Sequence, residues 1–95
     1  MRLSVEEQRA IVEAVLTRDP DARIWLFGSR ADDDARGGDI DIAILSSHLS
    51  RHDRMQIRSA IAARIGPQKI DIVISPDGHE PIFRIAQDTG KRLSA

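Results

Sequence analysis

With 95 residues, 41% of them hydrophobic and 31% charged, and a formal net charge of −1, the chain fits one domain, so we expect residues 1–95 to form a single unit without a second, substrate-binding domain. The small net charge argues against nucleic acid as the main partner, and the lack of cysteine excludes disulfides, thiolate zinc sites and cysteine nucleophiles. No apolar run approaches the roughly 20 residues of a membrane span and the N-terminus lacks the features of a secretory signal, so the sequence predicts a soluble, cytoplasmic protein.

The first half of the chain predicts one helix and two strands. Ser4 opens a Ser-x-x-Glu capping box, and apolar residues then recur at helical spacing until Asp19-Pro20 interrupts them. Short, β-branched and aromatic residues predict a buried strand over residues 22–27, which ends at a glycine. A short helix or loop over 29–36 follows, and a second strand is expected over 39–45.

The second half continues the alternation of helices and strands. A helix that is capped by Ser50 and stopped by Gly66-Pro67 precedes a third strand over residues 69–75. Pro81 suits the first position of a last helix, which ends near Gly90. This alternation favours an α/β fold in which helices pack on a small mixed β-sheet. The helix positions expected to face the core are Val5, Ile11, Val12, Val15 and Leu16 in the first helix, Met55, Ile57, Ile61 and Ile65 in the second, and Ile82, Phe83, Ile85 and Ala86 in the last.

Aspartates recur in the two strongest strand patterns. Because successive side chains of a strand point to opposite faces, Asp39 and Asp41 project together, away from the isoleucines that alternate with them. Asp71 has the same kind of position in the third strand and converges with them if that strand lies beside residues 39–45. Carboxylates held this close repel unless a cation lies between them, and Mg²⁺ prefers carboxylate and phosphate oxygens. The pattern predicts a site for Mg²⁺, with two ions expected, and gives Asp71 a further role as base.

The same aspartates have a simpler interpretation. Acidic residues on an edge strand can face water and discourage pairing with other chains. Aspartate is disfavoured in strands, however, so its recurrence in two strands downstream of a Gly-Ser turn favours the metal site.

A glycine-serine turn directly follows the predicted strand over residues 22–27. Gly28 lets the backbone approach a ligand closely, Ser29 supplies a hydroxyl, and the first N–H groups of a following short helix point toward a bound anion. Arg30 is within reach of the same anion, although an arginine at such a place is more often a solvated residue or a salt-bridge partner. We therefore expect Gly28, Ser29 and Arg30 to bind a triphosphate beside the aspartates.

Gly28-Ser29, nine intervening residues, Asp39-Ile40-Asp41 and the later Asp71 together resemble the signature of the DNA polymerase β-like nucleotidyltransferase superfamily. The chain looks most similar to the minimal nucleotidyltransferases of prokaryotes, and the resemblance covers most of its length. It implies transfer of a nucleoside monophosphate, commonly from ATP, with Mg²⁺ held by the residues that match Asp39, Asp41 and Asp71. It also implies that phosphate is held near Gly28 and Ser29.

Members of this superfamily as short as this chain are often antitoxins, which implies a protein partner. They are typically encoded with a small all-helical HEPN-type ribonuclease toxin, which they bind and in some cases inactivate by adenylylating a tyrosine. Since no separate domain is expected to present an acceptor, the sequence favours AMP transfer from ATP to a hydroxyl of a partner protein. The alternative is a non-catalytic module that neutralises the toxin by complex formation. The nucleotide, the acceptor and the oligomeric state stay open.

Other chemically suggestive residues have structural explanations. The run Asp32-Asp33-Asp34 has no fixed convergence and is expected to be a solvated loop. Trp25 is expected to pack in the core or an interface. Arg51, Arg54 and Arg58 form a basic stripe on the second predicted helix, which is a solvated face or a surface for an acidic partner or RNA. The histidines, expected at the surface without ligand partners, are His48, His52 and His79.

Overall fold

The computed structural model describes residues 2–32 and 38–94, and their helices and strands alternate as the sequence predicts, with one additional short strand. The elements are α1 (Val5–Arg18), β1 (Arg23–Phe27), the 3-10 helix η1 (Gly28–Ala31), β2 (Ile40–Leu45), α2 (Arg51–Ile65), β3 (Ile70–Ser75), α3 (Pro81–Thr89) and β4 (Lys91–Leu93). Capping boxes start both long helices, from Ser4 to Glu7 in α1 and from Ser50 to Asp53 in α2, because each serine and acid satisfies the other's backbone N–H.

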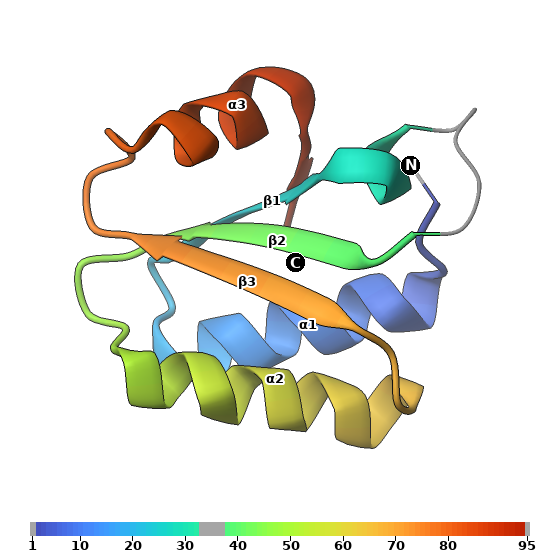
Figure 1. Cartoon of the computed structure of the whole chain (residues 1–95). Helices are drawn as coiled ribbons and strands as arrows, with labels where there is room; N and C mark the ends of the chain where they lie inside the picture. Colours follow the sequence, from blue (N-terminus) through green and yellow to red (C-terminus); the bar gives the residue numbers. More distant parts are fainter. Residues whose placement is uncertain (1, 33–37, 95) are drawn as a thin grey trace.

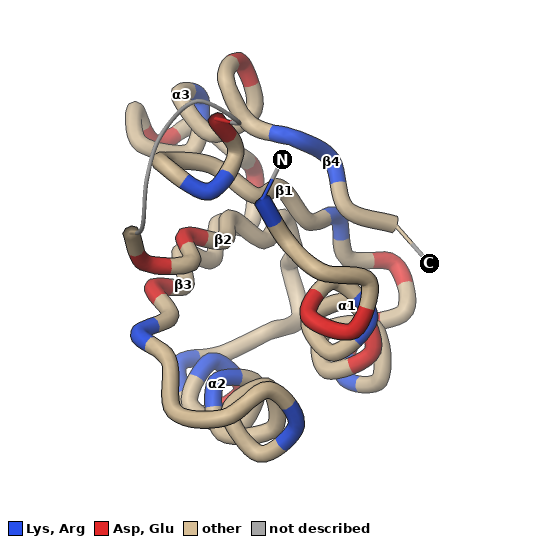
Figure 2. Tube along the Cα trace, turned by 90° about the vertical axis from the view of Figure 1, so that its right-hand side faces the viewer, with Lys and Arg blue, Asp and Glu red and all other residues tan. Residues whose placement is uncertain are grey.

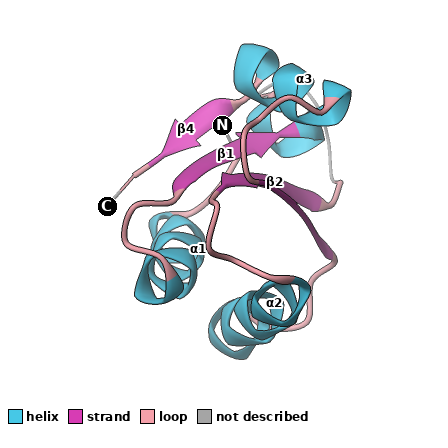
Figure 3. Ribbon diagram, turned by 90° about the vertical axis from the view of Figure 1, so that its left-hand side faces the viewer, coloured by secondary structure: helices cyan, strands magenta, loops and turns pink. Residues whose placement is uncertain are grey.

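One four-stranded sheet organises these elements, in the order β3-β2-β1-β4. β1 pairs antiparallel with β2 and β4, whereas β2 and β3 run parallel, so the sheet is mixed as predicted. Helices α1 and α2 cover one face of the sheet and α3 lies on the other (Figures 1 and 3). The starts of β2 and β3 lie at the same end of the sheet as η1 (Figure 1). That end carries the predicted site residues.

The face of the sheet toward α1 and α2 is closed by isoleucines. Ile40, Ile42 and Ile44 of β2 have no exposed surface, because alternate side chains of the strand all point into the same core. Burial of one such side chain stabilises the fold by about 1.5–3 kcal/mol. The helices contribute Ile11, Val12 and Val15 from α1 and Ile57 and Ile61 from α2 to this core.

A smaller cluster lies beneath α3. Ala43, Phe83 and Ala86 are fully buried there, and the small side chain of Ala43 leaves room for the Phe83 ring. Trp25 meets Phe83 edge to face at a ring-centroid distance of 5.6 Å, and the guanidinium of Arg92 lies 5.1 Å from the centre of the Trp25 ring. The prediction of Trp25 as a packing residue is therefore confirmed.

Four of the predicted core positions are wrong. Val5, Met55, Ile82 and Ile85 are 73%, 57%, 45% and 54% exposed. Val5 is the first residue of α1, before the helix meets the sheet, and Met55 lies on the outer side of α2. In α3 the buried residues are Phe83 and Ala86, so the residues that precede each of them lie about 100° around the helix and face outward.

β4 is the element that the sequence did not predict. Its three residues are paired with Ile24–Leu26 of β1, and only Leu93 among them is buried. A segment of three residues, two of them charged, is too short to show the alternation of apolar and polar residues that predicts a strand. The chain reaches β1 through Gly90, where a Cβ would collide with the carbonyl oxygens of Ala86 and Leu26. No helix within residues 2–32 and 38–94 has both the length and the hydropathy needed to cross a bilayer.

Candidate active site

The structure brings the three predicted aspartates to one end of the sheet. Asp41 of β2 and Asp71 of β3 are direct partners in the parallel register, on the face opposite the isoleucines, and Asp39 immediately precedes β2. Figure 2 shows acidic positions of β2 and β3 next to one another. Asp71 is exposed and the other two are half-buried, so the described residues leave these carboxylates accessible to a ligand.

Burial and the neighbouring carboxylates both disfavour the charged form of Asp41. Burial raises the pKa of the Asp41 carboxyl, and the neighbouring charges of Asp71 and Asp39 raise the pKa further. The ammonium of Lys69 acts in the opposite direction but is the smallest of these effects. Such a site favours whichever species brings positive charge between the two strands, a proton or a cation.

Asp39 is held by an ion pair in this structure. Its Oδ2 lies 3.4 Å from Nζ of Lys69, whose side chain is well exposed, whereas that of Asp39 is partly exposed. Among the described residues, no three acidic or histidine side chains already surround one point as metal ligands do. The donor set nevertheless fits Mg²⁺, since Asp41 and Asp71 offer hard oxygens from directly opposite positions, and burial together with the like charges of Asp71 and Asp39 raises the pKa of Asp41. In this structure the ammonium group of Lys69 balances the negative charge of Asp39.

The glycine-serine turn lies against these carboxylates. Gly28 has φ +72°, and a Cβ built on it would lie 2.5 Å from Oδ2 of Asp41, so only glycine fits between β1 and β2 here. A Cβ on Gly38 would likewise collide with Oγ of Ser29, which places the serine hydroxyl beside the segment that leads into Asp39. The turn and the two strands therefore bring a hydroxyl and carboxylates into one small area.

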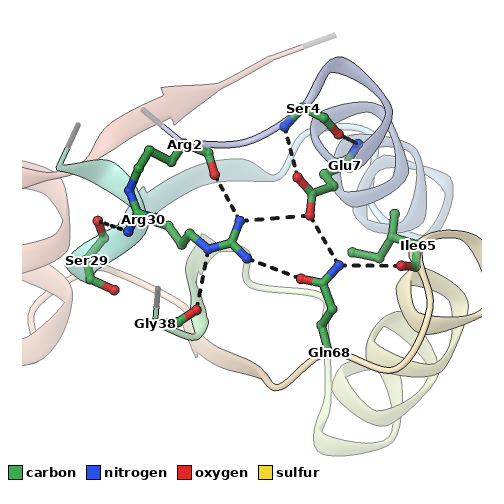
Figure 4. Close-up of polar contacts among 8 residues, drawn as sticks. All are labelled: Arg2, Ser4, Glu7, Ser29, Arg30, Gly38, Ile65 and Gln68. Atoms are coloured by element: carbon green, nitrogen blue, oxygen red, sulfur yellow. Dashed lines mark hydrogen bonds and ion pairs between the residues drawn. The ribbon is translucent and has the colours of Figure 1, made fainter. Parts of the chain in front are cut away.

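Arg30 is engaged by protein groups. Its Nη1 donates to the carbonyl oxygen of Arg2 (2.9 Å), Nη2 to Oε1 of Gln68 (3.3 Å) and Nε to the carbonyl oxygen of Gly38 (3.4 Å). Nη1 also lies 3.8 Å from Oε2 of Glu7 (Figure 4). The structure thus matches the salt-bridge alternative, and direct contact of Arg30 with phosphate would require these bonds to be exchanged. Its role toward phosphate stays a prediction.

Several residues around the site were not identified from the sequence. Gln68 and Glu7 hold the Arg30 guanidinium, and Nη2 of Arg2 donates to the carbonyl oxygen of Ser29 (3.0 Å). Lys69 was missed as the partner of Asp39. Its position directly before the third strand was the available signal, because the parallel pairing sets it beside the start of β2.

The acidic run and the histidines that the sequence assigns to the surface are exposed wherever the structure describes them. Asp32 is exposed, whereas Asp33 and Asp34 are outside the residues that the structure describes. All three histidines are exposed as predicted, and Nδ1 of His79 lies 3.5 Å from Oδ2 of Asp77.

Comparison with protein families agrees with this fold and arrangement. Residues 11–94 match the family model described as Polymerase beta, Nucleotidyltransferase. Because the match spans most of the chain, the chain belongs to the polymerase β-like nucleotidyltransferase family. No curated protein is similar enough to be matched to it. The α/β fold with a mixed sheet is the fold predicted from the sequence.

Proposed function

We propose that this protein is a Mg²⁺-dependent nucleotidyltransferase that transfers AMP from ATP to a hydroxyl of a partner protein. The observation that carries the proposal is the pairing of Asp41 with Asp71 across two parallel strands, directly beside the close approach of Gly28. The family match supports the reaction class. The raised pKa of Asp41 supports a cation at this place, because a carboxylate without a counter-charge costs stability.

The reaction needs positioning and charge neutralisation more than covalent chemistry by the protein. In our proposal the acceptor oxygen forms a bond to the α-phosphorus of ATP, and the bond from that phosphorus to the β-phosphate oxygen breaks. Pyrophosphate leaves, and the hydroxyl proton passes to Asp71. The N–H groups of the turn at Gly28 and the Ser29 hydroxyl hold the triphosphate, and Arg30 adds positive charge to that end of the site.

Asp39, Asp41 and Asp71 are the proposed metal ligands. Bound Mg²⁺, with two ions expected, supplies positive charge that neutralises the triphosphate and favours the ionised acceptor. Binding requires Asp39 to exchange its ion pair with Lys69, an exposed contact of the kind that contributes little to stability.

The proposed biological role is that of an antitoxin, with a small helical HEPN-type toxin as the partner protein. Exposure of Asp71 supports a protein acceptor, since a hydroxyl on another molecule can approach it from solvent. The competing proposal is neutralisation by complex formation alone. The acidic cluster supports chemistry over simple binding, because carboxylates that repel are unfavourable in a surface whose purpose is only to cover a partner.

The test uses ATP labelled at the α-phosphate, Mg²⁺ and the protein encoded beside this one. We expect label on the partner with the unaltered chain and a loss of at least about 100-fold with Asp41→Asn, since about 3 kcal/mol of charge stabilisation is removed. Asp21→Asn is the matched control, because Asp21 is an exposed aspartate near the opposite end of the sheet. It should label at the normal rate.

Two results separate the candidates. Toxin neutralisation that survives Asp41→Asn, with no label on any partner, would support binding alone and overturn the catalytic proposal. Label that persists in Asp41→Asn would show that the reacting site lies elsewhere.

A further inference from the structure

The outer edge of β3 is the longer open edge of the described sheet. β3 is the terminal strand of the order β3-β2-β1-β4, and the opposite terminal strand, β4, has only three residues. The hydrogen bonds between β3 and β2 extend from the one between the Ile40 N–H and the Lys69 carbonyl to the one between the Ser46 N–H and the Ser75 carbonyl. Since backbone groups alternate along a parallel strand, those of residues 70, 72 and 74 point away from β2. An extended segment can pair with those of residues 72 and 74, whereas the Ile70 carbonyl already accepts a bond from Arg58 that an added strand would have to exchange.

A row of arginines on α2 follows this edge. Nε of Arg58 donates to the outward carbonyl of Ile70 (3.1 Å), at the start of β3. Arg54 and Arg51 line a groove with Ile74 and Pro76, at the end of β3. Arg51 and Arg58 are seven positions apart, which corresponds to about 10 Å along a helix and is close to the roughly 13 Å that separates residues 70 and 74 of a strand.

The arginine row has spare charge and an apolar neighbour. Within residues 2–32 and 38–94, Arg51 and Arg54 have no acidic side chain within ion-pair distance. Met55, one turn from Arg51 and Arg58, is 57% exposed. A basic row with an exposed methionine suits an acidic protein segment, because methionine adapts to varied side chains.

A strand added to this edge has two different faces. Its alternate side chains on the α2 side lie over the arginine row, whereas those on the opposite side lie next to Asp71 and Val73. Side chains of paired residues have Cβ atoms about 5 Å apart. A hydroxyl-bearing residue opposite Asp71 is therefore placed beside the proposed base.

We infer that the outer edge of β3 and the row Arg51, Arg54 and Arg58 bind the acceptor segment of the partner as an added strand. This segment carries acidic residues at alternate positions and a hydroxyl residue between them. The inference rests on the proposed function and adds to it the mode by which the acceptor docks. Backbone hydrogen bonds supply affinity, and the arginines select acidic partners and set the register.

A second copy of this chain fits the edge poorly. Two β3 edges in contact would bring two arginine rows together and would set one Asp71 near the other. Nucleic acid would satisfy the arginines but not the outward N–H groups, which need backbone carbonyls in a regular row.

The direct test measures binding of a fluorescent nine-residue peptide with a central tyrosine, threonines on the tyrosine face and glutamates on the other. Arg54→Glu should weaken binding at least tenfold, and Arg9→Glu, which reverses an exposed charge on α1, should leave it within twofold. The same peptide N-methylated at alternate backbone positions should also bind at least tenfold more weakly, because it cannot complete the ladder. Nucleotide is omitted, so binding is measured independently of catalysis.

The outcomes distinguish this inference from the proposed function. Equal binding of the N-methylated peptide would overturn strand addition, even if AMP transfer were found. Displacement of the peptide by oligouridine at equal concentration, or dimers in sedimentation that Arg54→Glu alters, would assign the edge to RNA or to a second copy. Tight, methylation-sensitive binding without label transfer would uphold the docking site and count against the enzyme.

Discussion

Each end of the sheet carries an aspartate with reduced solvent exposure, and the surroundings shift the pKa of these two carboxyl groups in opposite directions. At the end away from η1, Asp19 is buried, accepts hydrogen bonds from the Ser46 hydroxyl and the Asp21 N–H, and has a lowered pKa, chiefly because of the Ser46 bond. At the other end Asp41 faces Asp71, and its pKa is raised. The first carboxylate accepts hydrogen bonds from two donors of the protein, whereas the second faces another carboxyl group.

This difference separates an acid that is satisfied within the fold from one that we propose to bind a metal ion. Asp19 joins the end of α1 to the segment after β2, and Ser46 in turn accepts the N–H groups of His48 and Leu49, so the whole corner is satisfied internally. In our proposal, the counter-charge for Asp41 comes from a bound cation. The fold tolerates a charged Asp41 because the isoleucines on the other face of the same strand are fully buried.

The largest change in stability is expected from a substitution at Asp19, the buried aspartate. Asp19→Ala removes a buried, charge-assisted pair of hydrogen bonds and should lower the free energy of unfolding by about 2–3 kcal/mol in urea denaturation at neutral pH. A lowered pKa gives stability that is present above the unfolded value, near 3.8, and is lost as the pH falls through the folded value. The difference in free energy of unfolding between the unaltered chain and the variant should therefore decrease as the pH falls below about 3.8. Asp21→Ala, an exposed neighbour, should change stability by less than about 0.5 kcal/mol.

A medium effect tests the residue that holds the turn. Arg30→Lys keeps the charge but cannot reach the carbonyls of Arg2 and Gly38 and the Gln68 amide together, so we expect a loss of about 1 kcal/mol. Arg9→Lys, on the exposed side of α1, should have no effect. If Arg30→Lys instead kept full stability and lost only affinity for ATP, the guanidinium would serve phosphate rather than the turn.

The smallest expected change in stability is an increase, in the variant Asp41→Asn. Without Mg²⁺, Asp41→Asn should raise the free energy of unfolding by up to about 1 kcal/mol, because it removes a like charge opposite Asp71. A raised pKa gives stability that is present at low pH and lost as the pH rises through the folded value, so the gain should appear at neutral pH and vanish near pH 3. If Asp41→Asn and the unaltered chain had equal melting temperatures both at neutral pH and near pH 3, the result would argue against repulsion between Asp41 and Asp71.

Much of the fold followed from local patterns in the sequence. Ser4, Ser50, Gly66-Pro67 and Pro81 mark helix ends, and the isoleucines of residues 40–44 and 70–74 define two strands by alternation alone. β4 could not be found because its pairing with β1, and not its own residues, makes it a strand. The exposed positions in α3 were missed because its periodicity admits several faces, and only contact with Ala43 selects one.

The candidate site was predictable to a similar extent. Alternation placed Asp39 and Asp41 on one face of their strand and gave Asp71 the same kind of position, but that the third strand lies beside the second was only a condition of the prediction, and its parallel direction came from the structure. The partners of Arg30 were beyond prediction, because Arg2, Glu7 and Gln68 come from three distant parts of the chain. Sequence spacing carries no information on which of many polar side chains meets a given guanidinium.

The parallel crossover has a consequence for how the molecule forms. Asp41 and Asp71 are 30 positions apart and become neighbours only when α2 has docked and β3 has closed the sheet. The antiparallel hairpin of β1 and β2 can assemble earlier without any acidic pair. During refolding, then, capacity for magnesium nucleotide should emerge last, which makes ligand uptake a reporter of completed topology rather than of collapse.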